Sequence, residues 1–238
     1  MAKPKYGNAL LKLSGEVLAG SRTQGFDPVF LSRMSSEIRS VVGTGVRLGL
    51  MVGGGNIARG AVSERNGVDR VSADYMGMLG TVINGLAVQD YLGRAGIKAP
   101  LLSAIDIGRI TEPATRRTAL KYLHTEKVVI FVSGTGNPYF TTDTAAALRA
   151  IEMEAQVLLK GTKVDGVYDS DPKKNKKAKR FETLSYIHFL ERGLRVMDAT
   201  AVSLCMENSL PIIVFDVLKE GNLRKAVMGR KIGTLVAS

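Results

Sequence analysis

Cysteine, histidine and tryptophan are nearly or wholly missing from this chain of 238 residues. Its single cysteine, Cys205, has no partner for an internal disulfide, and its neighbours suggest a helix that buries the thiol. The two histidines, His124 and His188, stand far apart and beside apolar residues. With no cluster of cysteine and histidine, the sequence offers no zinc site, and we interpret both histidines as structural.

Long apolar runs are missing as well. No stretch approaches the length of about 18 apolar residues that a membrane-spanning helix needs. Lys12 and Glu16 interrupt the N-terminal apolar stretch, which argues against a signal peptide, so we expect a cytoplasmic protein with no membrane partner. Hydrophobic residues make up 45% of the chain and no linker is visible, so residues 1–238 are expected to form one domain.

Lysine and arginine outnumber aspartate and glutamate, and the formal net charge is +11. Six basic residues lie in "KKNKKAKR", residues 173–180, so the remainder carries 11 − 6 = +5. The run is interpreted either as a solvated loop or as an attractant for anions. A nucleic-acid-binding module is the alternative from another class, but the run has no interleaved aromatic residues to stack on bases. Nucleic acid is therefore not the expected partner.

Short apolar runs alternate with helical patterns along the chain. The expected strands are 8–13, 46–52, 99–104, 127–132, 155–160 and 211–216, and the expected helices are about 28–42, 72–95, 115–124, 143–153, 185–192, 198–208 and 222–228. Strands that alternate with helices predict βαβ units, and nearly continuous apolar strands predict burial on both faces. The expected fold class is therefore α/β, with a mostly parallel sheet covered by helices on both faces.

Glycine-bearing loops follow four of these strands: "SG" at 14–15, "GGGN" at 53–56, "SGTGNP" at 133–138 and "GTKVDG" at 161–166. The carboxyl ends of parallel strands meet at one edge of a sheet, where ligands bind. Helices begin after most of these loops, so backbone N–H groups and positive dipole ends gather there. Two of the strands also carry a lysine near this end, Lys12 and Lys160. The sequence therefore predicts a phosphate-binding edge.

Three common phosphate-binding designs do not fit. Gly53, Gly55 and Ala58 match the dinucleotide fingerprint, with Asp74 at 19 residues beyond Gly55, but Asp74 falls at a predicted helix start instead of a strand end. That position disfavours an NAD(P)-dependent oxidoreductase. The Walker triplet of glycine, lysine and serine or threonine is absent, and so is the protein-kinase catalytic loop.

The helix expected after Asp74 carries an apolar pattern of its own. Met76, Leu79, Ile83 and Leu86 recur at helical spacing. Glycines at 77, 80 and 85 are predicted to let another helix approach closely, and we expect a packed subunit interface there.

Six segments carry a close resemblance to a known family: "LLKLSGEVL", "VGGGNIARG", "DYMGMLGTVINGLA", "SGTGNPYFTTDTAAALRAIE", "LLKGTKVDGVYDSDP" and "LRVMDATA". The sequence resembles the bacterial-type uridylate (UMP) kinases of the amino acid kinase family, from about residue 8 to the C-terminus. The resemblance implies a three-layer αβα sandwich and a homohexamer. It also implies transfer of the γ-phosphoryl group of ATP to UMP in pyrimidine nucleotide biosynthesis, with Mg²⁺ held mainly by the phosphates and no metal site of the protein's own.

The resemblance also assigns residues to each substrate. Acceptor contacts are expected mainly from the N-terminal part and 135–142, and ATP contacts mainly from the C-terminal part. The ATP-binding residues that it implies are Lys12, Leu13, Ser14, Gly15, Gly55, Arg59, Thr162, Tyr168 and Asp171. The UMP-binding residues that it implies are Gly54, Asp74, Thr135, Gly136, Asn137, Pro138, Tyr139, Phe140, Thr141 and Thr142.

Catalysis is expected to rest on positioning and charge neutralisation. A phosphate monoester has a second pKa of about 6 and is already a nucleophile at pH 7, so no general base is needed. Lys12 and Lys160 are predicted to stabilise the transferring group. Asp143 and Asp198 are predicted either to hold these lysines or to cap helices.

Two questions stay open at this level. A kinase for aspartate, glutamate or carbamate is the alternative within the same superfamily, although "GTGNPYFTTD" favours a nucleotide acceptor. Family members are often activated by GTP and inhibited by UTP, and the loop 20–26 and the helix around Asp90 resemble regulatory regions. Some relatives carry arginine immediately before that aspartate, whereas this chain has Gln89, which argues against activation by GTP.

Overall fold

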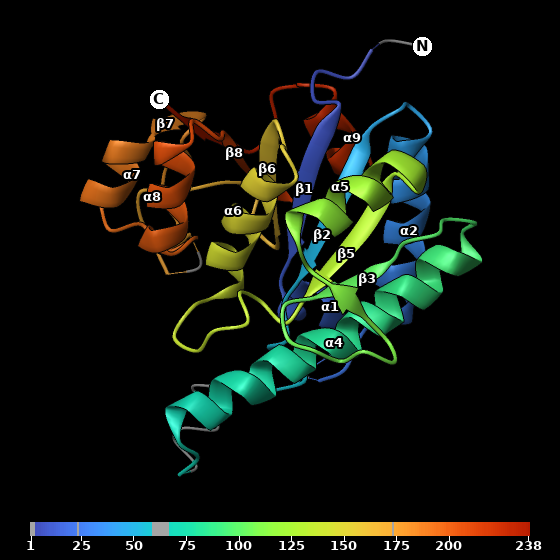
Figure 1. Cartoon of the computed structure of the whole chain (residues 1–238). Helices are drawn as coiled ribbons and strands as arrows, with labels where there is room; N and C mark the ends of the chain where they lie inside the picture. The colour runs from blue at the N-terminus through green and yellow to red at the C-terminus, as the bar shows by residue number, and fades with distance from the viewer. Residues whose placement is uncertain (1–2, 23, 59–66, 173) are drawn as a thin grey trace.

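A sheet of nine strands runs through the middle of the molecule (Figure 1). The computed structural model describes residues 3–22, 24–58, 67–172 and 174–238. Within them the strands are β1 (Asn8–Leu13), β2 (Arg47–Val52), β3 (Leu101–Ser103), β4 (Glu112–Pro113), β5 (Val128–Val132), β6 (Val157–Thr162), β7 (Thr183–Ser185), β8 (Ile212–Asp216) and β9 (Thr234–Ala237). Their order is β4-β3-β5-β2-β1-β6-β8-β9-β7. Neighbours are parallel except β8 and β9, which are antiparallel.

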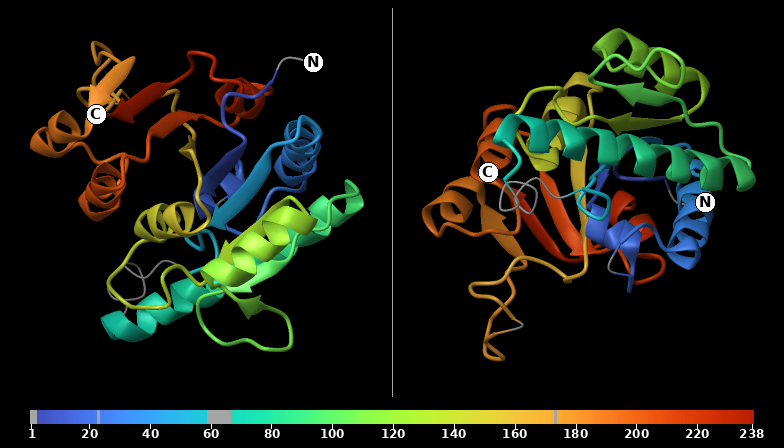
Figure 2. Two further views of the ribbon diagram at one scale, coloured as in Figure 1. Left: turned by 45° about the horizontal axis from the view of Figure 1, so that its top comes forward. Right: turned by 90° about the horizontal axis from the view of Figure 1, so that it is seen from below.

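Helices cover both faces of this sheet. They are α1 (Gly15–Ala19), α2 (Pro28–Val42), α4 (Arg70–Arg94), α5 (Arg116–Thr125), α6 (Thr142–Glu152), α7 (Tyr186–Glu191), α8 (Ala199–Glu207) and α9 (Asn222–Val227). One buried cluster joins α2, α4 and α9 to the sheet, and a second joins α5, α6, α7 and α8 to it. The two further views in Figure 2 show these helices on either side of the strands. The α/β class and the three αβα layers are confirmed.

Alternation along β1 explains how a lysine fits into an apolar strand. Successive side chains of a strand point to opposite faces. Ala9, Leu11 and Leu13 enter the cluster under α2, whereas Leu10 enters the cluster under α6. Lys12 therefore lies on the α6 side of the sheet, where it is 7% exposed. Its ammonium group needs a partner on that side, because an unpaired charge in an apolar layer is costly.

Six strands and seven helices lie where the sequence predicts them, with ends that differ by two residues or fewer. β1 and α2 have the predicted bounds. Asp69 caps α4, accepting the amide N–H groups of Val71 and Ser72, so the helix begins two residues earlier than expected. The sequence analysis missed α1, β4, β7 and β9, which have two to five residues each. Such short elements carry too little of a hydrophobic period to be recognised.

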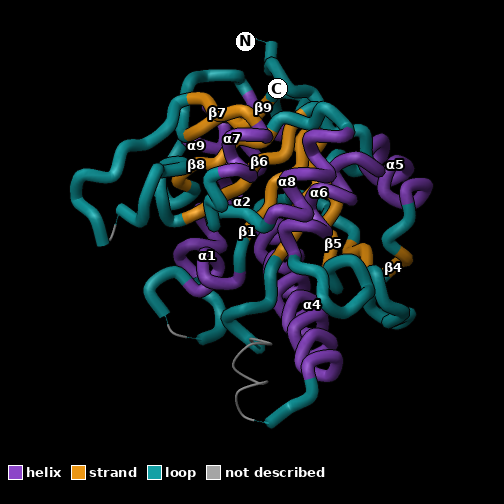
Figure 3. Tube along the Cα trace, turned by 90° about the vertical axis from the view of Figure 1, so that its left-hand side faces the viewer, coloured by secondary structure: helices purple, strands orange, loops and turns teal. Residues whose placement is uncertain are grey.

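Two glycines of α4 let other parts of the same chain approach the helix closely. A Cβ on Gly80 would lie 3.2 Å from the carbonyl oxygen of Gly54, and one on Gly85 would lie 2.5 Å from Val132. These two glycines let the loop after β2 and the sheet itself approach the helix, and the subunit interface expected along α4 stays a prediction. Figures 1 and 3 show the N-terminal half of α4 extending beyond the end of the sheet.

Two expectations from the scarce residues can be compared with the structure. Cys205 is fully buried in α8, and burial raises the pKa of its thiol to about 12. The thiol therefore stays protonated at neutral pH. In the part of the chain that the structure describes, no helix combines the length and apolarity needed to cross a bilayer.

Candidate functional site

Two lysines and one aspartate form a charged cluster at the carboxyl end of the sheet. Lys12 of β1 and Lys160 of β6 occupy the same register position on neighbouring parallel strands. The carboxylate of Asp143, in the first turn of α6, lies between them. Its Oδ1 is 2.7 Å from Lys12 Nζ, and its Oδ2 accepts a hydrogen bond from Lys160 Nζ. The cluster carries one net positive charge and is almost fully buried.

The surroundings of this cluster change two pKa values. Burial and, after it, the nearby charge of Lys12 lower the pKa of Lys160, and although Asp143 opposes both effects, the pKa falls to about 8. Burial alone would raise the pKa of Asp143, but the attraction of both lysines outweighs burial and lowers it. Asp143 is therefore ionised at neutral pH. Lys160 is mostly protonated at pH 7 and is half deprotonated near pH 8.

Asp198 lies next to this cluster and contacts it indirectly. Its carboxylate caps α8 by accepting the amide N–H of Ala201, and it also accepts the hydroxyls of Thr141 and Thr144. Thr141 in turn caps α6, where Asp143 lies. Asp198 raises the pKa of Lys160 only as a longer-range charge. Asp143 thus holds the lysines directly, whereas Asp198 fixes the start of the helix that carries Asp143.

Three glycines let backbone segments meet at the same edge. A Cβ on Gly15 would lie 2.2 Å from the Asn56 Oδ1, and one on Gly53 would lie 3.0 Å from the amide nitrogen of Gly15. A Cβ on Gly54 would lie 2.5 Å from the carbonyl oxygen of Gly77 in α4. Because real side chains do not approach so closely, these positions require glycine. The loops after β1 and β2 and the start of α4 therefore pack backbone against backbone.

Two buried asparagines tie these loops together. Asn84 of α4 is fully buried and donates to the carbonyl oxygen of Gly53 at 2.7 Å. Its side-chain amide also pairs with that of Asn56 at 2.6 and 3.1 Å. Asn56 further donates to the carbonyl oxygen of Gly25. Since buried amides are stable only when they are hydrogen-bonded, this pair fixes the loop after β2 relative to α4.

A cavity of about 370 Å³ opens between this loop, α4 and the segment after β5. It is lined by Glu16, Gly54, Gly55, Ala58, Ala73, Asp74, Gly77, Met78, Thr81, Gly134, Thr135, Phe140 and Thr142. Asp74 shapes its wall, because its carboxylate accepts the amide N–H of Tyr139 at 2.8 Å and pairs with Arg70 at 3.0 Å. Ser133 and Tyr139 have positive φ angles of 63° and 70°, a strain typical of ligand-binding segments.

A second cavity, of about 590 Å³, is formed by the segment after β6 and the turn after α7. It is lined by Val164, Gly166, Val167, Tyr168, Asp169, Ser170, Asp171, Pro172, Lys174, Arg192, Gly193, Leu194, Arg195 and Val196. Tyr168 donates its hydroxyl to Asp165 at 2.7 Å, which fixes the ring beside the cavity. The walls thus combine one aromatic ring with three basic residues, a combination suited to a charged ligand with a flat part.

The sequence profile of the Amino acid kinase family matches residues 9–216. The chain belongs to this family. The chain is also similar over its whole length to solved structures of two UMP kinases. The UMP kinase from Bacillus anthracis is 37% identical, with a TM-score of 0.94 and coverage of 98% of this chain and 96% of that one. The UMP kinase from Ureaplasma parvum is 36% identical, with a TM-score of 0.91 and full coverage of both chains.

A more distant likeness extends to an archaeal protein. The uridylate kinase from Archaeoglobus fulgidus is 27% identical to this chain, with a TM-score of 0.76. The match covers 96% of this chain and 99% of that one. The resemblance stated from the sequence motifs is therefore confirmed at the level of family and fold.

The fold brings most of the predicted site residues to one edge of the sheet. Gly54, Asp74, Thr135, Phe140 and Thr142 line the smaller of the two cavities. Tyr168 and Asp171 line the larger one, and Thr162 lies at the end of the strand that leads to it. The predicted residues Leu13 and Ser14 adjoin the lysine cluster, Ser14 as the cap of α1. Gly136, Asn137, Pro138 and Tyr139 lie in the segment after β5, and Arg59 lies outside the described residues.

Sequence reasoning missed several polar residues of this edge. Asn84 and Thr81 face it from α4, and Thr81 accepts the amide N–H of Ser133 at 2.6 Å. Arg192 and Arg195 line the larger cavity. Arg195 lies within the quoted motif "LRVMDATA", so the motif carried a signal for it. Thr81 and Asn84 lie within the quoted motif "DYMGMLGTVINGLA", so that motif also carried a signal, although the partners of Asn84 lie about thirty residues away in the chain.

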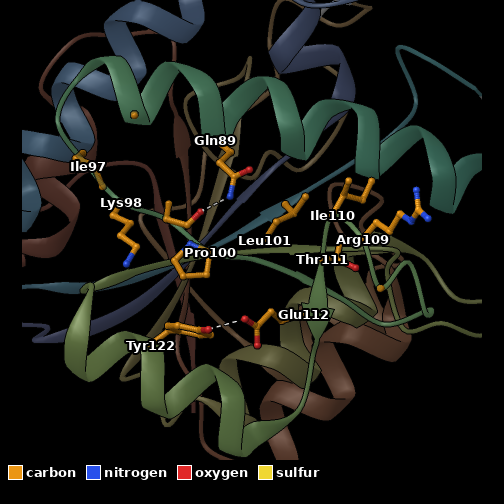
Figure 4. Close-up of a pocket in the computed structure, with 13 residues that line it drawn as sticks. Gln89, Ile97, Lys98, Pro100, Leu101, Arg109, Ile110, Thr111, Glu112 and Tyr122 are labelled. Carbon is orange, nitrogen blue, oxygen red and sulfur yellow. Dashed lines mark hydrogen bonds between the residues drawn. The ribbon is translucent and has the colours of Figure 1, made fainter.

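A third cavity, of about 540 Å³, lies beside Gln89, at the end of α4 opposite Asp74 (Figure 4). The side-chain amide of Gln89 donates to the carbonyl oxygen of Ala99 at 2.8 Å, and Tyr122 donates to Glu112 at 2.6 Å. Lys98 and Arg109 supply positive charge on its walls. The side chain of Gln89 is therefore engaged with the backbone.

The donor set was compared with what Mg²⁺ requires. Hard cations prefer several carboxylate or carbonyl oxygens. Among the described residues, no three aspartate, glutamate, histidine or cysteine side chains come together in a way that could hold a metal. The one carboxylate at the centre of the edge, that of Asp143, is already paired with two ammonium groups. These residues suit a cation that arrives with a polyphosphate better than one held by the protein itself.

Proposed function

We propose that this member of the Amino acid kinase family is a UMP kinase, which transfers the γ-phosphoryl group of ATP to UMP and forms UDP and ADP in pyrimidine nucleotide biosynthesis. One observation carries the phosphoryl-transfer part of the proposal. Two buried lysines, one on each of two neighbouring strands, share a single carboxylate at a glycine-rich edge of the sheet. One cavity lies beside the loop after β2 and the segment after β5, and another lies beside the segment after β6. The full-length likeness to UMP kinases supports UMP as the acceptor.

The acceptor is assigned to the smaller of the two cavities at the carboxyl edge, that of about 370 Å³. Gly54 would lie at the phosphate of UMP and Asp74 on its nucleoside side, while the segment from Thr135 to Thr142 would wrap the nucleotide. The phosphate of UMP is dianionic above its second pKa of about 6, so it attacks without a general base. This explains how a site whose central carboxylate is bound by two lysines can still be catalytic.

The donor is assigned to the lysine cluster and to the larger of the two cavities at the carboxyl edge, that of about 590 Å³. Thr162, Tyr168 and Asp171 would lie around the adenosine. The residues that would meet the phosphates are Lys12, Leu13, Ser14, Gly15, Gly55 and Arg59. This assignment places the donor mainly in the C-terminal part of a single domain, residues 1–238, and the acceptor mainly in the N-terminal part and 135–142.

Lys12 and Lys160 would offset the repulsion between the two phosphates. Positioned donors of this kind act mostly on the transition state, where negative charge spreads over the transferred group. Asp143 holds both ammonium groups at one point, and Asp198 fixes the start of the helix that carries Asp143. Mg²⁺ bound to the polyphosphate would supply further charge neutralisation.

Two further properties belong to the same proposal. The exposed apolar side chains of α4 support self-association, which we propose proceeds to a homohexamer. The cavity beside Gln89 is the candidate site for GTP as an activator or UTP as an inhibitor. Its engaged glutamine argues against GTP as an activator, since the amide cannot pair with a phosphate as an arginine does.

A coupled assay of ADP release tests the proposal. ATP and Mg²⁺ are held constant, and UMP, CMP, dUMP, AMP, glutamate and carbamate are supplied in turn as acceptors. We expect UMP to give the highest kcat/KM. Turnover with glutamate or carbamate and none with UMP would move the chain to another branch of the family.

A further inference from the structure

A cavity of about 310 Å³ lies at the opposite end of the sheet from the candidate site. Its walls come from the residues that precede β1, from the start of β7 and β8, and from the turn between α9 and β9. It is lined by Lys5, Tyr6, Arg180, Glu182, Thr183, Ile213, Gly229, Arg230, Lys231, Ile232, Gly233 and Leu235. In Figure 1 this end of β1 lies near the N-terminus, whereas its other end points toward α1 and α4. We call it the rear cavity.

The floor of the rear cavity is apolar and closely packed. Tyr6 and Ile213 are buried, and Ile232 and Leu235 are half-buried. The turn that leads into β9 is fixed, because Gly233 has a φ of 62° and a Cβ there would lie 2.0 Å from the carbonyl oxygen of Val214. Such a floor suits a flat apolar group and does not by itself attract ions.

The rim of the same cavity is strongly basic. Lys5, Arg180, Arg230 and Lys231 stand against a single acid, Glu182. Only Arg180 has a carboxylate within ion-pair distance among the described residues, namely Asp165. A Cβ on Gly229 would lie 2.5 Å from Lys5 Cδ, so this glycine makes room for the lysine stem. Four like charges converge here with little compensation, which favours an anion between them.

We propose that the rear cavity is a second ligand site, which takes a phosphate ester of a flat, apolar group. The floor would hold the flat group, and the guanidinium and ammonium groups of the rim would hold the phosphate. Its volume lies at the small end of the range for ligand pockets, about 300–1,000 Å³, which suits one ring system and its phosphate. The site is separate from the cavities assigned to the two substrates, with which it shares no lining residue.

Arg180 connects this site to the larger substrate cavity. Its Nη1 donates at 3.1 Å both to the carbonyl oxygen and to Oδ2 of Asp165, whose Oδ1 accepts the hydroxyl of Tyr168. A Cβ on Gly166 would lie 2.8 Å from Arg180 Cδ, so the arginine packs against the segment that lines that cavity. An anion in the rear cavity would compete with Asp165 for the guanidinium and loosen Tyr168. This coupling rests on the proposed function, but binding in the rear cavity does not.

Pyridoxal 5′-phosphate is the probe that tests binding, because it joins a flat ring and a phosphate to an aldehyde. Its aldehyde condenses with a lysine amine with loss of water, and borohydride reduces the imine to a stable secondary amine. The full-length protein is labelled in the presence of saturating ATP and UMP, and the modified lysines are identified by peptide mass spectrometry. Pyridoxal without the phosphate is the matched control reagent.

We expect Lys5 or Lys231 to be labelled at least tenfold more than the exposed Lys121, with the phosphate reagent only. Arg230→Ala should reduce this excess at least fivefold, whereas Arg117→Ala, an exposed arginine of α5, should leave it unchanged. Equal labelling of the three lysines, or equal labelling by both reagents, would overturn the site. ATP and UMP should protect Lys12 and Lys160 from the reagent. Labelling of either lysine in their presence would count against the proposed function, but it would not affect the proposal for the rear cavity.

Coupling is tested separately with pyridoxine 5′-phosphate, which has an alcohol in place of the aldehyde and cannot form an imine. It should change the KM for ATP at least twofold in the native protein and leave it unchanged in Arg180→Ala. An unchanged KM in the native protein would remove the coupling between the two cavities.

Discussion

Lys12 and Lys160 face each other across the β1–β6 pair at the same register position, and the carboxylate of Asp143 lies between their ammonium groups. This arrangement leaves one net positive charge among side chains that are largely buried. A phosphate that enters the site meets two cations whose positions are already fixed. The predictions that follow concern the charge, the titration and the stability of this cluster, and the surfaces that adjoin it.

Removal of either lysine should slow turnover strongly without unfolding the protein. Loss of one preorganised donor typically reduces rates by ~10²–10³-fold. We expect Lys12→Ala and Lys160→Ala to show this decrease in kcat, while Lys121→Ala, which removes an exposed lysine, stays within twofold of the native rate. The far-ultraviolet circular dichroism of all three variants should match. An unchanged rate in Lys160→Ala would remove this residue from the mechanism.

ATP binding should weaken as the pH rises through about 8. The pKa of Lys160 is lowered to about 8 by burial and by Lys12, so the group is charged below this pH and neutral above it. The dissociation constant for ATP, measured by calorimetry between pH 6.5 and 9.5, should therefore increase on the alkaline side. Lys160→Met cannot titrate, so its weaker binding should not show this step. A step of equal size in Lys160→Met would assign the titration to another group.

Asp143→Asn should destabilise the protein and make its stability depend on nucleotide. Two buried ammonium groups would lose the carboxylate that pairs with both of them, and breaking a buried ion pair costs about 3–5 kcal/mol. A bound polyphosphate would replace the lost charge. We expect the midpoint of thermal unfolding to fall and to recover with ATP by more than the native protein gains. An equal gain in both proteins would show that the phosphates do not contact the two lysines.

Asp74→Ala should weaken acceptor binding more than donor binding. Asp74 holds the amide N–H of Tyr139, and so fixes the segment proposed to wrap UMP. The KM for UMP should rise at least tenfold, with the KM for ATP within twofold of its native value. Glu154→Gln, which breaks an exposed ion pair with Arg116, is the matched control and should change neither. Equal increases for both substrates would contradict the assignment of the smaller cavity to the acceptor.

Polar substitution on α4 should disrupt self-association. Leu79 and Ile83 are about half exposed on the same face of this helix, beside Tyr75, Met76 and Leu86. Contiguous exposed apolar side chains are typical of interaction surfaces. In sedimentation velocity, Leu79→Lys combined with Ile83→Lys should sediment as a smaller species than the native protein. Val29→Lys, at an equally apolar but isolated site, should not, and a native protein that is monomeric would refute the proposal.

Regular elements were predictable from this sequence because their signals are local. The continuous apolar run of β1 and the capped, amphipathic α2 each carry their own evidence, and both have the predicted bounds. β7 and β9 were missed because three or four residues have no period, and their place in the sheet depends on pairing with distant strands. The antiparallel pairing of β9 with β8 has no local signal at all.

The residues of the candidate site also divide into those that the sequence could predict and those whose role only the fold shows. Lysines near strand ends could be predicted, because parallel strands deliver them to one edge. Asp143 and Asp198 could not be told apart from the sequence, since both lie at helix starts and only the fold places one of them between the lysines. Asn84 and Arg195 lie within quoted motifs, but only the fold shows which distant residues they adjoin.

A crystal structure with a non-hydrolysable ATP analogue, UMP and Mg²⁺ tests the central claim most directly. We predict that the γ-phosphate of the analogue and the phosphate of UMP meet at Lys12 and Lys160, with at least one phosphate oxygen within hydrogen-bond distance of each Nζ. Phosphates that bind elsewhere, with both lysines still paired only with Asp143, would contradict it.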